Sequence, residues 1–97
     1  MWGIKNMYYK ELEKIEDIAK QLINEKYEKG YFKCTASYEQ NIDCIKILLN
    51  GYKNDDLSQR YYADYNIAVS IYENCEDKES CIKSAIEYMM TNFYNFK

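Results

Sequence analysis

The chain has 97 residues, which is enough for one domain with a single modest core. Its composition, 47% apolar and 30% charged, is that of a globular protein, and its net charge of −3, with acidic residues interleaved among the basic ones, argues against direct binding of nucleic acid. The chain contains no His, so Ser–His and Cys–His catalytic pairs are excluded, and we predict a protein that is not an enzyme and has no catalytic residue, metal or cofactor.

The N-terminal third of the chain is predicted to form one long helix, over residues 5–29. Apolar side chains recur there at steps of four and three residues, which is the period of an amphipathic helix. Gly30 follows as a left-handed stop. The apolar stripe consists of Tyr8, Leu12, Ile15, Ala19 and Leu22.

The rest of the chain is predicted to form three more helices, over residues 38–50, 57–74 and 78–94. Ser37 and Gln40 have the spacing of a capping box, and Asp77 can cap the last helix. The chain has no Pro and few Gly, so few tight turns are available. The short connections then predict an all-α fold, a single helical domain over residues 1–97 built as an antiparallel four-helix bundle. Its expected core includes Leu12, Ile15, Leu22, Ile45, Leu49, Ala68, Ala85 and Met89.

The stretch "RYYADYNIAVSIY", residues 60–72, is unusually rich in tyrosine. On the predicted third helix Tyr61, Tyr65 and Tyr72 share the apolar stripe, and Tyr62 lies at its edge. These phenols either fill the core or form a recognition face, because Tyr combines a large rigid ring with a polar tip. An AT-rich genome would also enrich Tyr without any functional demand. We expect Tyr62 to contact a partner and Tyr65 to stabilise the core.

The cysteines leave three arrangements open: two disulfides, a metal site or free thiols. The nine residues between Cys34 and Cys44 resemble half of a twin CX9C helical hairpin, but five residues separate Cys75 from Cys81, so no function is transferred from that family. The closely spaced cysteine pairs of structural zinc sites are absent. Without an export signal free thiols are favoured. The candidate disulfide cysteines are Cys34, Cys44, Cys75 and Cys81.

The location predicted from the sequence is cytoplasmic. No secretory signal follows the first residues, and no apolar run approaches the roughly 18 residues of a membrane span. A processed exported form would have the same sequence.

The function predicted from these observations is that of a small acidic protein-binding module, acting as an inhibitor or neutraliser. Immunity proteins and phage anti-defence proteins are often single acidic domains of this kind. The partner would be another protein, such as a toxin or a nucleic-acid enzyme with a basic groove. The alternatives are a structural domain that forms a homodimer and, less favoured, a thiol redox protein. The predicted partner-binding face consists of Asp55, Asp56, Tyr61, Tyr62, Asp64 and Tyr65.

Overall fold

The computed structural model describes residues 2–53 and 58–96. Within these ranges the chain forms three helices and four strands. They are α1 (Trp2–Lys26), β1 (Tyr31–Glu39), β2 (Cys44–Tyr52), β3 (Arg60–Ala68), α2 (Val69–Glu73), α3 (Lys78–Thr91) and β4 (Tyr94–Phe96).

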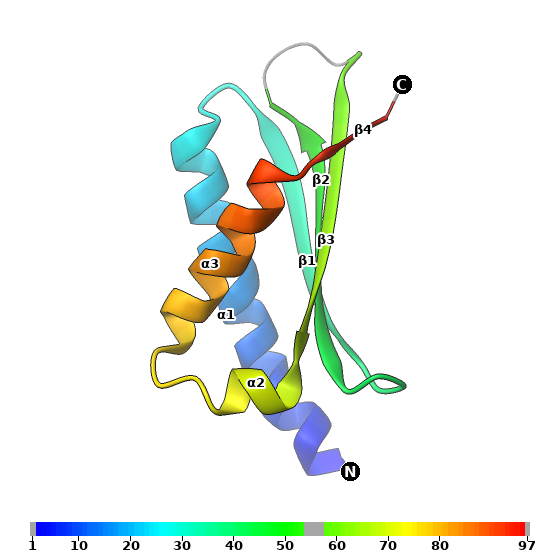
Figure 1. Ribbon diagram of the computed structural model, residues 1–97, viewed down its shortest axis with the longest axis vertical. Helices are drawn as coiled ribbons and strands as arrows, with labels where there is room; N and C mark the ends of the chain where they lie inside the picture. The colour runs from blue at the N-terminus through cyan, green and yellow to red at the C-terminus, as the bar shows by residue number, and fades with distance from the viewer. Residues whose placement is uncertain (1, 54–57, 97) are drawn as a thin grey trace.

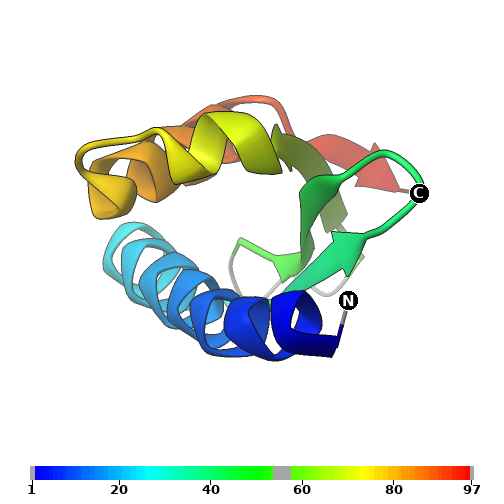
Figure 2. The same ribbon diagram turned by 90° about the horizontal axis from the view of Figure 1, so that it is seen from below.

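The four strands form one antiparallel sheet in the order β1-β2-β3-β4. Leu49 on the central strand β2 lies opposite Cys34 of β1 and Ala63 of β3. The short strand β4 pairs with β3 from Arg60 to Tyr62. Both long helices lie on one face of the sheet, α1 along β1 and α3 on the side of β3, and no element of the described chain covers the opposite face (Figure 1; Figure 2).

The two long helices lie close to where the sequence predicts them, but α1 ends at Lys26, and Gly30 does not have the left-handed φ predicted for a helix stop. In α1 the buried residues Ile15, Ala19 and Ile23 recur at steps of four. At the start of α3 the Asp77 side chain accepts a hydrogen bond from the backbone N–H of Ser80 at 3.2 Å, so the predicted cap is confirmed. Neither these helices nor α2, within the described ranges, combine the length and apolar character that a bilayer-crossing helix needs.

The predicted all-α four-helix bundle is wrong, because the protein has an α+β fold. The two segments expected to be helical, residues 38–50 and 57–74, mainly form the strands β2 and β3. In β2 the buried residues Ile45, Ile47 and Leu49 alternate with half-buried ones, which is the period of a strand. The step of four from Ile45 to Leu49 equals two strand repeats and also one helical repeat, so the pattern alone did not separate the two structures.

The residue types and turns of this region agree with strands. Ile and Tyr, which together provide seven of the 18 residues of β2 and β3, are favoured on a pleated surface. Ser37 lies inside β1 and does not cap a helix, and Asp43 ends the β1–β2 turn with a φ of 50°, which Asp tolerates. Gly51, which directly follows the predicted helix over residues 38–50, lies inside β2. A Cβ there would collide with the backbone carbonyl oxygen of Tyr31 on β1.

The core lies between the sheet and the two long helices. Five of the expected core residues are buried in it, namely Ile15, Ile45, Leu49, Ala85 and Met89. Leu12 and Leu22 are partly buried and pack against this core. The prediction for Ala68 is wrong, because strand alternation places it on the sheet face that points away from the helices, where it is half-buried.

Candidate functional site

The predicted partner-binding face does not form a single surface. On β3 successive side chains point to opposite faces of the sheet. Tyr62 and Asp64 therefore lie on the open face, whereas Tyr61 and Tyr65 lie on the face that carries the helices. Asp55 and Asp56 lie outside the described residues.

The open face around Tyr62 is mainly polar. The Tyr62 hydroxyl donates a hydrogen bond to Asp64 Oδ2 at 3.4 Å, and Arg60 Nε donates to Asn50 Oδ1 at 2.7 Å. Antiparallel sheets commonly expose one polar face to water in this way. These contacts are sufficient to explain Tyr62 as a half-buried surface residue.

Tyr61 belongs to an aromatic cluster at one end of the core. Its ring centroid lies 5.9 Å from that of Phe93, which stacks on Phe32 at 5.1 Å. The Lys53 ammonium lies 4.4 Å from the centre of the Tyr61 ring, within the range of a cation–π contact. Tyr61 thus has a structural role.

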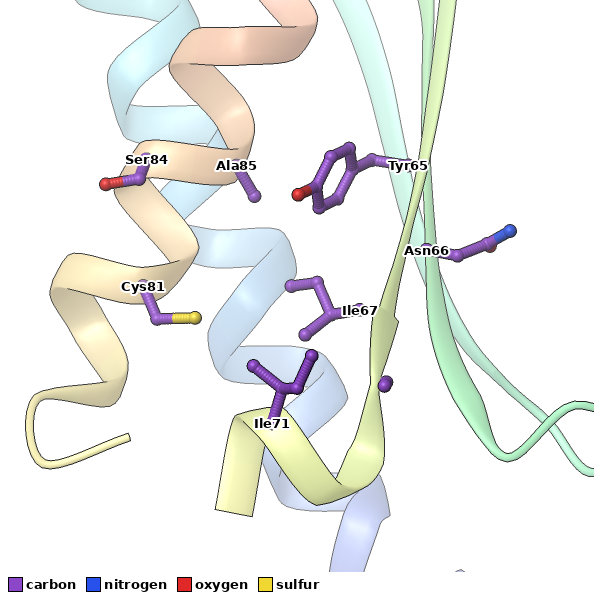
Figure 3. Close-up of a pocket in the computed structure, with 8 residues that line it drawn as sticks. Tyr65, Asn66, Ile67, Ile71, Cys81, Ser84 and Ala85 are labelled. Carbon is purple, nitrogen blue, oxygen red and sulfur yellow. The ribbon is translucent and has the colours of Figure 1, made fainter. Parts of the chain in front are cut away.

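Tyr65 lines a groove between β3 and α3, which we call the β3–α3 groove. Its ring lies 5.6 Å from the ring of Tyr88 on α3. Figure 3 shows the larger of two hollows in this groove. The side chains of Tyr65, Ile67, Ile71, Cys81 and Ala85 point toward one another, whereas those of Asn66 and Ser84 point away. This hollow has a volume of about 240 Å³ and is lined by Tyr65, Asn66, Ile67, Ala68, Ile71, Cys81, Ser84 and Ala85. The second hollow, of about 100 Å³, shares Tyr65 and is lined by Ala63, Asp64, Tyr65, Tyr88, Met89 and Asn92.

The groove concentrates exposed apolar surface. Ile71 is 62% exposed, Tyr88 50% and Tyr65 38%. Three of the six large exposed hydrophobic residues in the described chain therefore lie around one groove. Of the residues that line the two hollows, Asp64 alone carries a charge. This clustering of exposed apolar side chains makes the β3–α3 groove the candidate site of the molecule.

Sequence reasoning missed Ile71 and Tyr88. On the predicted helix over residues 78–94, Tyr88 lies off the face that carries the expected core residues Ala85 and Met89. A large aromatic residue outside the core-facing stripe of a helix is a signal that could have identified it. The sequence around Ile71 carries no comparable signal, because the exposure of Ile71 depends on where β3 ends and α2 begins.

Comparisons of the chain with protein-family models, curated proteins and solved structures found no match. The groove and its chemistry are therefore the basis for a functional proposal.

The four cysteines carry free thiols, and two of them lie at or near the groove. Cys81 lines the larger hollow, and burial together with a hydrogen bond that its thiol donates to Cys75 raises the pKa of the Cys81 thiol. Cys34 faces α1 from β1, where burial and the nearby Glu16 carboxylate raise the pKa of its thiol to about 12. Within the described ranges no group of three or more Cys, Asp or Glu side chains is arranged to hold a metal ion.

Proposed function

We propose that this protein is a small protein-binding module whose recognition surface is the β3–α3 groove. The observation that carries the proposal is the gathering of Tyr65, Ile71 and Tyr88 around hollows with almost no charge. Rigid aromatic and branched aliphatic side chains in a partly desolvated depression are the usual anchors of protein interfaces. Acting through such a groove, the module would inhibit or neutralise its partner by occupying the partner's surface.

The chemistry of the groove favours a protein partner. Phosphate-bearing ligands need clustered basic groups, and none of the residues that line the two hollows is Lys or Arg. A raised pKa keeps the Cys81 thiol protonated near neutral pH, so it is a poor nucleophile. Both features support recognition by shape and apolar contact.

The proposed surface differs from the face proposed from the sequence. It retains Tyr65 and adds Ile71 and Tyr88, whereas Asp64 lies at its rim with its side chain on the open face. Tyr61 is assigned to the aromatic cluster, and Tyr62 to the polar open face.

The test is a selection of random peptides from a display library on the immobilised full chain. Selected peptides are then measured against Ile71→Asp and Tyr88→Asp. The matched controls are Ile42→Asp and Tyr31→Asp, because Ile42 is 56% exposed and Tyr31 69% exposed at positions that do not line either hollow. We expect the groove variants to weaken binding at least about tenfold, the equivalent of roughly 1.4 kcal/mol, and the controls to leave it unchanged. Equal losses in both pairs, or no loss in either, would refute the proposal.

A further inference from the structure

The outer edge of β3 is only partly covered. Strand β4 pairs with Arg60, Tyr61 and Tyr62. Within the described chain, no strand pairs with the outer edge of β3 over residues 63–68. Half of the backbone N–H and C=O groups along that stretch point away from β2 and toward this edge.

The opposite edge of the sheet is protected in a way that the β3 edge is not. Helix α1 lies along β1, and Glu16 Oε2 accepts a hydrogen bond from the backbone N–H of Ala36 at 2.8 Å. Proteins usually block a free edge with such contacts, with Lys, or with Pro, because an open edge pairs with other chains. Residues 63–68 contain neither Lys nor Pro.

The free edge and the groove lie side by side. Ala63, Tyr65 and Ile67 point toward the helices and line the two hollows. A strand laid along this edge would place every second side chain over the same hollows, and its remaining side chains beside Asp64 on the open face. Main-chain pairing and side-chain insertion would then occur together, as in recognition by strand addition.

We propose that the occupant of the groove is an extended segment of another protein, which adds to the sheet as a strand antiparallel to β3. This inference rests on the proposed function. The segment alternates apolar residues with polar ones and carries a Lys or Arg opposite Asp64. The antiparallel direction follows β4, which occupies the same edge in that direction.

Charge favours this occupant over a second copy of the chain. Residues 60–92, which build the groove, contain three basic and six acidic residues. Two such surfaces repel each other, whereas a segment with a basic residue is attracted to Asp64.

The probe is a short acetylated and amidated peptide in which Val alternates with Thr and one Thr position is Lys. Binding to the isotope-labelled full chain is followed by NMR. We expect amide shifts concentrated at residues 63–68. We also expect about twofold to fivefold weaker binding when the peptide Lys is replaced by Glu, since exposed ion pairs contribute little. In Asp64→Asn protein the Lys and Glu peptides should bind about equally.

Two N-methylated peptides separate strand addition from simple apolar contact. Methyl groups on the alternate amides that face β3 remove donors needed for pairing, and should abolish binding. Methyl groups on the other amides should leave binding nearly unchanged. If both peptides bind like the parent while Ile71→Asp still weakens binding, strand addition is wrong and the groove remains the recognition surface.

Three further outcomes would contradict the proposed occupant, strand addition itself or the proposed function. A chain that sediments as a dimer, becomes a monomer in Tyr65→Lys and does not bind the peptide has a second copy as its occupant. A monomer that binds no peptide at residues 63–68 contradicts strand addition. If, in addition, peptides selected from the library bind elsewhere, the proposed function fails as well.

Discussion

Tyr72 shows how one of the clustered tyrosines serves the fold. It is 1% exposed, and its hydroxyl donates a hydrogen bond to Glu11 Oε2 at 2.6 Å, joining α2 to α1 across 61 positions of sequence. The Lys78 ammonium lies 5.8 Å from the centre of its ring. The sequence correctly indicated an apolar environment for Tyr72, but its partner Glu11 could not be predicted, because the contact depends on the tertiary fold.

Replacing Tyr72 by Phe should destabilise the protein by about 1–3 kcal/mol, because it removes a hydrogen bond to a carboxylate and leaves the ring in place. Urea unfolding followed by circular dichroism measures the change. Tyr31→Phe is the control, since Tyr31 is 69% exposed and should change stability by less than about 0.5 kcal/mol. Equal midpoints for wild type and Tyr72→Phe would show that the hydrogen bond contributes nothing.

The same residue predicts how stability changes at alkaline pH. Burial, followed by the hydrogen bond to Glu11, raises the pKa of Tyr72 above its value of about 10 in the unfolded chain. The protonated Tyr72 phenol therefore contributes its full share of the folding stability below about pH 10, and this contribution is lost as the pH rises toward the folded-state pKa. Wild-type protein should therefore lose stability above about pH 10 more steeply than Tyr72→Phe. Identical slopes in urea titrations at successive pH values would contradict this.

Cys34 gives a prediction about reactivity. Its pKa is raised to about 12 by burial and then by Glu16, with a smaller opposing effect of Lys20. Because the thiolate is the reactive form, iodoacetamide near neutral pH should label Cys34 more slowly than Cys44, as read by peptide mass spectrometry. In urea both should react alike. Faster labelling of Cys34 than of Cys44 in the folded protein would show that its side chain is not held against α1.

At the scale of elements, the sequence predicts α1 and α3 and fails at β2 and β3. In the two helices the apolar positions fit a period near 3.6 and no strand period. In β2, Leu48 and Tyr52 on the open face are apolar as well, so the alternation with Ile47 and Leu49 is hidden. Strand pairing is also a long-range property, since β2 is fixed by neighbours on both sides.

Leu48 and Leu49 provide a direct test of this strand. Leu49 is fully buried, so Leu49→Ala should cost about 2–5 kcal/mol through lost contacts and a cavity. Leu48 is half-buried on the open face, so Leu48→Ala should lower the free energy of unfolding by less than Leu49→Ala does. Urea midpoints of the two variants provide the comparison. If Leu48→Ala is the more damaging change, the faces of β2 are reversed.

At the scale of the whole molecule, two helices cover one face of a sheet (Figure 1). Within the described residues, the edge of β3 over residues 63–68 is not paired with another strand and lies beside the β3–α3 groove. The molecule is 43 Å long, and an edge of six residues spans about 20 Å, which is enough for one added strand. Composition alone predicted an acidic binding module. It could not locate the surface, because Tyr65, Ile71 and Tyr88 come together only through the fold.

Amide hydrogen exchange along β3 tests the central claim most directly. In the free chain, the N–H groups of residues 63–68 that point toward β2 should exchange slowly, and the alternate ones, which point to the free edge, should exchange fast. Addition of the Val–Thr peptide should slow the fast set and leave the slow set unchanged. The account is contradicted if all of these amides are already protected in the free chain, or if the peptide binds in the groove and the fast set stays fast.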